Sequence, residues 1–140
     1  MSEKQKIEYC QLETGYEFPP SSYNLDSAIA SSYLKAVEDT SNLYQDTNLV
    51  PPMAIAAYAM ASLSEHISLP PGTIHVSQEF EFRSAVNIND TLTSYARVSR
   101  KQSRGEFHLL SVDLNVVDQN QKVVLTGKTS FILPAPGEVT

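Results

Sequence analysis

The sequence predicts an α+β fold in which an antiparallel sheet of long strands curls around one buried helix. The helix is indicated by an apolar, alanine-rich run at Met53–Ala61 that carries no charge before Glu65. The sheet is indicated by Thr73–Leu133, where apolar and polar residues alternate in stretches joined by short polar turns, as in consecutive antiparallel strands. A length of 140 residues favours one compact domain over residues 1–140, and the polar residues 1–6 are expected to be disordered.

Composition narrows the functional class before any motif is considered. Charged residues make up 19% of the chain, the net charge is −6, and the basic residues are scattered, which argues against a nucleic-acid-binding surface. The single cysteine, Cys10, excludes an internal disulfide framework and fits a reducing setting. The N-terminus has no apolar segment typical of a signal peptide, and no stretch has the length of a membrane-spanning helix. We therefore expect a cytoplasmic protein that binds neither nucleic acid nor membrane.

The first third of the chain predicts one helix between loops. A short strand is possible within Ile7–Phe18, although glycine and proline interrupt it, and Pro19–Leu25 is predicted to be a loop. Asp26 is a suitable N-cap for a helix over Ser27–Val37, where apolar residues recur at helical spacing. The polar stretch Thr40–Asn48 predicts a second loop.

The central helix is predicted at Met53–His66. Pro51 and Pro52 stand where it should begin, since proline is tolerated in the first turn, and the stretch LPPG at Leu69–Gly72 ends it. Its side chains are apolar almost all round, a pattern typical of a helix that is enclosed on every side. We expect the sheet to enclose it.

Four strands follow the central helix. Their apolar residues alternate with polar ones, most clearly in the first and the third strand. Such a sheet often leaves an exposed edge that a second copy can extend. The strands are expected at Thr73–Arg83, Thr91–Arg100, Phe107–Val117 and Lys122–Leu133, with turns at Asn87–Asp90, Ser103–Gly105 and Asp118–Gln121.

The order of these elements resembles the hotdog fold. Four stretches are similar to its MaoC-like branch, which includes (R)-specific enoyl-CoA hydratases and 3-hydroxyacyl thioester dehydratases, and the resemblance covers roughly residues 20–134. It implies a single hotdog domain in fatty acid metabolism that pairs as a homodimer or with another hotdog subunit. It also implies an acyl-CoA or acyl-carrier thioester as ligand, with no cofactor and no metal. The stretches are Tyr23–Val37, Ala36–Asp46 (AVEDTSNLYQD), Val50–Ala61 and Phe80–Thr93 (FEFRSAVNINDTLT).

The second of these stretches resembles the family's active-site segment, G-D-x-N-P-[hydrophobic]-H. Asp39 falls on the catalytic aspartate, Glu38 replaces the usual glycine, and Tyr44 falls on the catalytic histidine. Tyrosine, with a pKa of about 10, is a poor base at neutral pH but a good hydrogen-bond donor. This pattern also resembles the degenerate N-terminal half of double-hotdog dehydratases. The alternatives are a turn residue for Asp39 and a half-buried aromatic residue for Tyr44.

Candidate substrate-binding groups lie around the central helix. The backbone N–H groups of Met53 and Ala54 at its start could hold a thioester oxygen, since the helix dipole favours negative charge there; simple helix capping is the alternative. His75 could reach the same groove, whereas His66 and His108 are expected to be structural. No histidine has metal-ligand spacing with a partner residue. A loose basic cluster, which could meet the phosphates of coenzyme A or lie in solvent, comprises Arg97, Arg100, Lys101 and Arg104.

Three functions remain open at this point. The first is an acyl-thioester hydratase or dehydratase that uses Asp39 and an unconventional base. The second is a non-catalytic subunit that binds an acyl chain and pairs with a partner carrying the Asp/His pair. The third is a ligand-binding scaffold without thioester chemistry. A thioesterase is disfavoured, because Glu65 is the one carboxylate of the central helix and lies near its far end.

Overall fold

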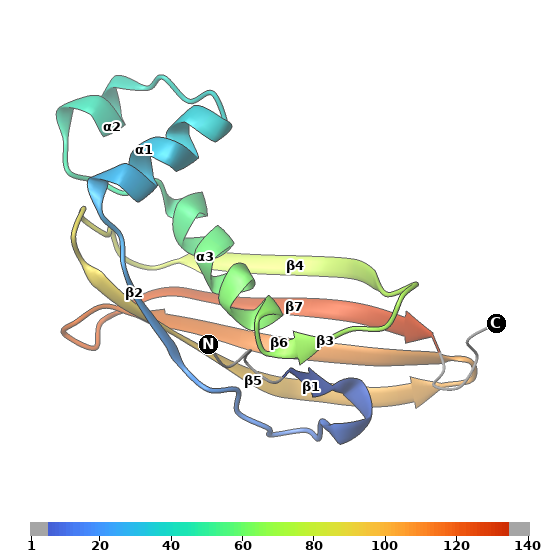
Figure 1. The fold of residues 1–140 in the computed structure, drawn as a ribbon. Coiled ribbons are helices and arrows are strands. Elements are labelled where there is room, and N and C mark those ends of the chain that lie inside the picture. The colour runs from blue at the N-terminus through green and yellow to red at the C-terminus, as the bar shows by residue number, and fades with distance from the viewer. Residues whose placement is uncertain (1–5, 135–140) are drawn as a thin grey trace.

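A computed structural model describes residues 6–134, and the disorder expected for residues 1–6 falls almost wholly outside them. Five antiparallel strands form the main sheet in the order β2-β5-β6-β7-β4 (Figure 1). The antiparallel sheet expected from the alternating pattern is therefore confirmed. Its strands are β2 (Ser21–Asn24), β4 (Ile74–Phe82), β5 (Thr91–Arg104), β6 (Phe107–Val117) and β7 (Val123–Pro134).

The central helix α3 (Pro52–Ser64) lies against the concave face of this sheet (Figure 1). Pro51 is its N-cap residue and Pro52 its first residue, as predicted from the tolerance of proline in a first helical turn. One side of the helix is buried. Full enclosure was expected and is wrong for this chain, because Met53 is 49% exposed and Ala57 and Ala61 are also exposed. The buried residues are Ala54, Ile55, Ala56, Ala59 and Leu63.

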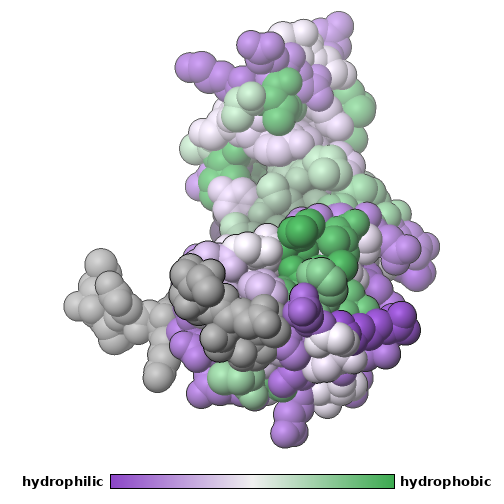
Figure 2. Space-filling view, turned by 90° about the vertical axis from the view of Figure 1, so that its right-hand side faces the viewer, coloured by the Kyte–Doolittle hydropathy of each residue, from purple (hydrophilic) through white to green (hydrophobic). Residues whose placement is uncertain are grey.

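The strand β4 forms one edge of the sheet and is mostly exposed. Its apolar side chains Ile74, Val76 and Phe82 are 59%, 44% and 42% exposed. Figure 2 looks onto the side of the molecule where β4 begins and shows apolar side chains gathered there beside hydrophilic ones. The single chain therefore leaves one side of α3 and the β4 edge of the sheet partly uncovered.

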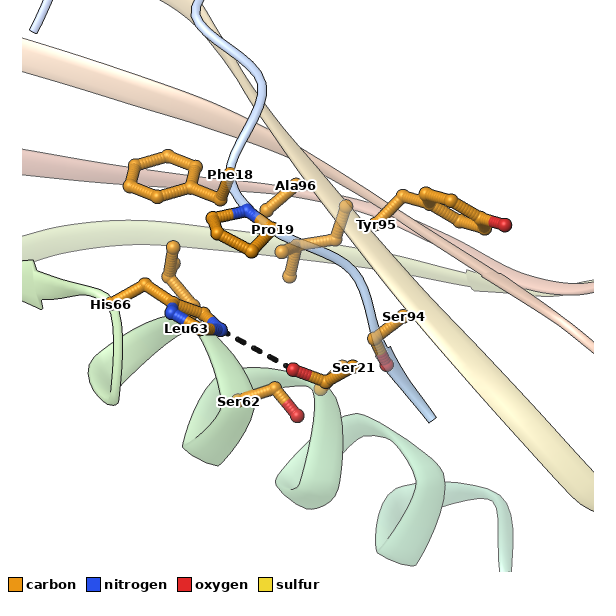
Figure 3. Close-up of a pocket in the computed structure, with 11 residues that line it drawn as sticks. Phe18, Pro19, Ser21, Ser62, Leu63, His66, Ser94, Tyr95 and Ala96 are labelled. Carbon is orange, nitrogen blue, oxygen red and sulfur yellow. Dashed lines mark hydrogen bonds between the residues drawn. The ribbon is translucent and has the colours of Figure 1, made fainter. Parts of the chain in front are cut away.

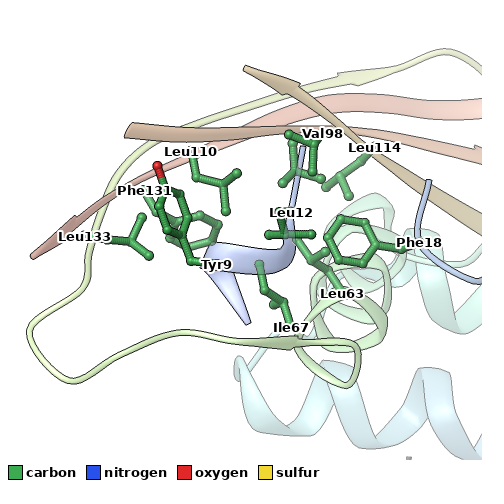
Figure 4. Packing of buried hydrophobic residues seen from close by; sticks show 11 residues of the cluster. Tyr9, Leu12, Phe18, Leu63, Ile67, Val98, Leu110, Leu114, Phe131 and Leu133 are labelled. Carbon is green, nitrogen blue, oxygen red and sulfur yellow. The ribbon is translucent and has the colours of Figure 1, made fainter. Parts of the chain in front are cut away.

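Two clusters of buried apolar residues fill the space between the sheet and the helices. One surrounds Leu63 and Phe131 (Figure 4), and the other surrounds Ile55 and Leu125. Phe80 on β4 packs against both clusters. Its ring lies over Gly127 of β7, where an added Cβ would stand 2.9 Å from the ring and 2.6 Å from the Glu79 carbonyl oxygen. Glycine at this position allows β4 to approach β7.

The N-terminal segment contains structure that the sequence did not predict. β2 was expected to be a loop, yet it pairs residue by residue with β5, from Ser21 opposite Ser94 to Asn24 opposite Thr91. The short strand considered within Ile7–Phe18 is present as β1 (Ile7–Glu8), which pairs in parallel with the unpredicted β3 (Ile67–Ser68). The short 3-10 helix η1 (Tyr9–Gln11) follows β1. These contacts attach the start of the described chain to the end of α3.

Two further helices lie beside the start of α3, above one end of the sheet (Figure 1). α1 (Ser27–Ala36) begins with the Asp26 carboxylate accepting the Ile29 N–H at 2.8 Å, which confirms the predicted cap. α2 (Asn42–Asp46) lies in a stretch expected to be a loop, and Ser41 caps it. We call this pair of helices, with the segment between them, the helical lobe.

Two general features bear on function. No helix among the described residues is long and apolar enough to span a membrane. Residues 6–134 also contain no group of three or more His, Cys, Asp or Glu side chains arranged to hold a metal ion.

Candidate functional site

Asp39 lies in the helical lobe, between α1 and α2. Its side chain is exposed, and its Oδ1 accepts the Ser41 N–H at 2.9 Å, while its own N–H donates to the Leu34 carbonyl at 2.9 Å. These are the bonds of a local turn. They leave Oδ2 of the carboxylate open to solvent, so the turn does not prevent the group from holding a water molecule.

The residue before Asp39 has an unusual backbone. Glu38 follows the C-cap of α1 and has a positive φ of 56°, a left-handed conformation that glycine adopts at no steric cost. The family segment that this stretch resembles usually has glycine here. Glu38 therefore adopts the conformation that a glycine at this position would adopt without steric cost.

Tyr44 lies on α2 and is half-buried. Its N–H donates to the Ser41 carbonyl at 3.3 Å, and its hydroxyl has no hydrogen-bond partner within residues 6–134. Asp39 and Tyr44 therefore both lie in the helical lobe. The three histidines of the chain bond to hydroxyl groups elsewhere, so the lobe contains a carboxylate and a phenol but no imidazole.

The start of α3 offers one of the two backbone donors predicted there. Pro51 provides no side-chain cap, and the Met53 N–H has no partner in the described part of the chain. The Ala54 N–H is not free, contrary to expectation, because it donates to the Pro51 carbonyl at 3.0 Å. An unpaired amide at a helix N-terminus attracts a negatively charged or polarised oxygen.

His75 lies away from these groups. Val50, just before α3, bonds to Val86, which follows β4, so α3 begins near the end of β4, whereas His75 lies near the start of that strand. The seven residues from His75 to Phe82 span about 23 Å of strand. The His75 Nε2 shares a hydrogen bond of 2.7 Å with Thr129, and its ring lies 4.9 Å from that of Phe131. His75 therefore does not reach the helix start in this chain.

Two residues of the predicted basic cluster, Arg100 and Lys101, make contacts within the chain. Lys101 donates to the Leu12 carbonyl at 2.7 Å and lies 4.6 Å above the Tyr9 ring, so it has a structural role. Arg100 bonds to Gln102, its neighbour along the same face of β5. His108, expected to be structural, bonds to Ser103 at 2.9 Å.

Sequence reasoning missed a small, mostly apolar cavity between α3 and β2 (Figure 3). Its volume is about 10 Å³, and Ser21, Ser62, His66 and buried Ser94 contribute polar atoms to its lining. The Ser21 hydroxyl and the His66 Nε2 share a hydrogen bond of 3.4 Å across it. The serines of the PPSSYN stretch were the available signal, but that stretch was predicted to be a loop.

The family of the chain can now be given. Residues 13–127 match the family described as the FAS1-like dehydratase domain region. This chain belongs to that family. No curated protein matches it. The FAS1-like dehydratase assignment supports the MaoC-like hotdog dehydratase family expected from the four sequence stretches.

Similar solved structures confirm the hotdog fold of this chain. The unliganded R-hydratase PhaJ1 from Pseudomonas aeruginosa is 21% identical, with a TM-score of 0.80 over 96% of this chain and 90% of that chain. A MaoC-like dehydratase from Rhodospirillum rubrum is 15% identical, with a TM-score of 0.74 over 92% and 97%. The C-terminally truncated HadBC complex, a 3R-hydroxyacyl-ACP dehydratase from Mycobacterium tuberculosis, is 16% identical, with a TM-score of 0.63 over 85% and 96%.

Proposed function

We propose that this chain binds 3-hydroxyacyl or enoyl thioesters, on coenzyme A or a carrier protein, as one subunit of a hydratase or dehydratase in the cytoplasm. The observation that carries the proposal is the uncapped start of α3 with its unpaired Met53 N–H, in a family of dehydratase regions. The thioester carbonyl oxygen gains negative charge when water adds to the double bond. A free amide at the positive end of a helix dipole stabilises that charge.

Asp39 is proposed to orient the water molecule of this reaction. Hydration bonds the water oxygen to the β-carbon and delivers a proton to the α-carbon, so it needs a base and an acid. The free oxygen of Asp39 can accept a proton or a hydrogen bond, and the Tyr44 hydroxyl can donate one. Neither replaces an imidazole that titrates near neutral pH. We therefore assign the missing base to a partner chain.

A second hotdog subunit is the proposed partner. In residues 6–134, β4 has a strand on one side only, and its side chains Ile74, Val76 and Phe82 are exposed. Burying each of these side chains would contribute about 1.5–3 kcal/mol. The ChsH1-ChsH2 and HadBC structures are complexes of two named components. A heterodimer with an Asp/His-bearing chain fits the incomplete site better than a homodimer.

The test combines a binding measurement with an activity assay. Crotonyl-CoA and a longer trans-2-enoyl-CoA are titrated into the purified chain, and hydration is followed separately in a coupled assay. Met53→Pro removes the proposed donor at a position where proline is compatible with a helix, and Met53→Ala is the matched control that keeps it. We expect binding to weaken at least about tenfold in Met53→Pro only, with helical content unchanged by circular dichroism.

The outcome with Asp39→Ala separates the alternatives. Hydration by the isolated chain that disappears in Asp39→Ala would mean an enzyme that works without the usual histidine. Binding without turnover supports the paired subunit. Absence of binding to both thioesters, in a folded protein, would contradict the proposal and leave the ligand-binding scaffold.

A further inference from the structure

The outer face of the main sheet, which points away from α3, carries a row of four charged side chains. On β6, Asp113 is exposed while the residues on either side of it along the strand are buried in the core, so its carboxylate points outward. The strand register places Arg97 of β5 on one side of Asp113 and Lys128 of β7 on the other. Glu79 of β4 in turn pairs with Lys128. The charges therefore alternate across β5, β6, β7 and β4 as positive, negative, positive and negative.

These charges are available to a second molecule. Lys128 and Asp113 form a long ion pair of 3.9 Å, in which their side chains stay 49% and 54% exposed. The exposed side chains of Arg97 and Glu79 have no ion-pair partner within residues 6–134. An exposed ion pair in water holds its partners weakly. The four side chains thus keep most of their capacity to bind oppositely charged groups of another molecule.

The row is complementary to itself in one of the two aligned orientations. Two sheets that pack face to face lie about 10 Å apart, and identical copies do so about a twofold axis in the plane between them. With the axis parallel to the strands and between β6 and β7, Arg97 faces Glu79 of the second copy. Asp113 then faces Lys128 of the second copy. With the axis perpendicular to the strands, each strand would face itself and like charges would meet.

The outer face is also hollowed where the second copy would lie. A groove of about 710 Å³ runs over β5 and β6 beside the segment that precedes β2, and its lining includes Arg97 and Asp113. In the complementary orientation, β4 and β7 of the second copy lie over this groove. Glu79 and Lys128 of that copy would enter it, each toward its opposite charge. Glu17, which pairs with Arg97 at the sheet edge, would lie beyond β4 of that copy.

One end of the same face is apolar. Phe107, at the start of β6, is 60% exposed and pairs with Pro134 of β7. Leu109 pairs with Ile132, and both are partly exposed. Phe107 and Leu109 share a face with Asp113, because alternate residues of a strand point the same way. An axis parallel to the strands places this end over the same end of the second copy, so Leu109 would pack on Ile132 of that copy. The apolar residues therefore favour the same orientation as the charges.

From these observations we propose that two copies of this chain pack back to back through the outer faces of their main sheets, about a twofold axis parallel to the strands. Four strands about 4.8 Å apart and about eight residues long present about 500 Å² on each copy. A total of about 1,000 Å² is typical of a weak, reversible interface. The contact leaves α3, the helical lobe and the β4 edge uncovered, so the inference goes beyond the proposed thioester function and does not depend on it.

The experiment measures the molar mass of the full chain by light scattering over a dilution series. All variants carry Phe82→Lys, which places a charge on the β4 edge and so separates this contact from edge pairing. Phe82 pairs with Leu125, which is buried on the other face of the sheet. We expect the molar mass of two copies at high concentration, with a dissociation constant of the order of 10–100 μM.

Two charge reversals test the orientation of the copies. Arg97→Glu and Glu79→Lys should each weaken pairing at least about tenfold, because like charges would meet twice across the twofold axis. An equimolar mixture of the two variants should pair within about threefold of the parent affinity. In the mixture the two reversed charges face each other and the two unchanged charges face each other, so both contacts are attractive. A folding defect or a repulsion inside one chain would persist in the mixture.

The control is Lys35→Glu on α1, which changes the net charge as Arg97→Glu does but lies in the helical lobe. It should leave pairing unchanged. A monomer up to about 500 μM, single reversals that pair as tightly as the parent, or a mixture that stays apart would each overturn the inference. Circular dichroism checks folding, and the mixing comparison is repeated without Phe82→Lys. Thioester binding is measured separately with Met53→Pro, so failure of one proposal leaves the other standing.

Discussion

The two edges of the main sheet differ in almost every property that controls strand pairing. β2 is four residues long, consists of Ser, Ser, Tyr and Asn, and follows Pro19 and Pro20. β4 is nine residues long, contains no proline, and exposes Ile74, Val76 and Phe82. Short strands, polar side chains and proline are devices that protect an edge from another strand. The comparison teaches that one edge is closed by its sequence and the other is left available.

The largest expected effect comes from placing a charge on the available edge. Val76→Lys and Phe82→Lys should each weaken assembly with a hotdog partner at least about a hundredfold, because an apolar contact worth about 1.5–3 kcal/mol is replaced by a buried charge. The molar mass of the assembly, measured by light scattering over a dilution series, reports this change.

The matched control lies on the protected edge. Ser22→Lys on β2 should leave the molar mass unchanged. If it disrupted assembly as strongly as Val76→Lys, the distinction between the two edges would be wrong.

A smaller effect is expected from the residue that allows β4 to lie on β7. In Gly127→Ala the new Cβ would collide with the Glu79 carbonyl and the Phe80 ring, and the resulting shift of β4 should lower the free energy of unfolding by about 2 kcal/mol. Urea denaturation checks this, with the exposed Lys128→Ala as control. A decrease in the free energy of unfolding of less than about 0.5 kcal/mol would contradict this expectation, because β4 would then shift without a measurable loss of stability.

The smallest effect concerns the protected edge. Tyr23→Phe removes the hydrogen bond to Ser94 and should cost about 1 kcal/mol at neutral pH. Burial raises the pKa of Tyr23, so the unfolded chain ionises first, near the usual tyrosine value of about 10. Stability should therefore be constant below about pH 10 and fall as the pH rises above it.

Alkaline urea titrations test the sign of this dependence. Part of the decrease in the free energy of unfolding at alkaline pH should be absent in Tyr23→Phe. The full decrease should remain in Tyr95→Phe, because the Tyr95 side chain is exposed in the folded chain. A flat profile in the unmodified protein up to about pH 11 would contradict the expected contribution of the buried tyrosines.

The long elements could be predicted from the sequence because their patterns are local. The alternation in Phe107–Val117 and the apolar run after Pro52 place β6 and α3 within two residues of their ends. β2 and α2 were missed for a different reason. Their residues are polar and few, and β2 exists because β5 supplies hydrogen-bond partners from more than sixty positions away, which no local pattern contains.

The candidate site stays a prediction. Matching residues to a family segment selected Asp39 and Tyr44 from one short stretch, and helix geometry indicated Met53, whose N–H has no partner in residues 6–134. The position of His75 could not be predicted, because it depends on which end of β4 meets the start of α3. The exposed side of α3 could not be predicted from the sequence either. An all-apolar helix has the same composition whether it is covered by its own chain or by a partner.

Pro19 and Pro20, which directly precede β2, bear on how large the proposed assembly could become. A sheet with two available edges adds subunits without limit and grows into a filament, whereas a sheet with one available edge stops after a single pairing. If pairing runs through β4 as proposed, a dipeptide remote from that edge would limit the stoichiometry of edge pairing to two. On the proposed pairing, one association event would cover the single available strand, so an apolar edge would not by itself lead to aggregation.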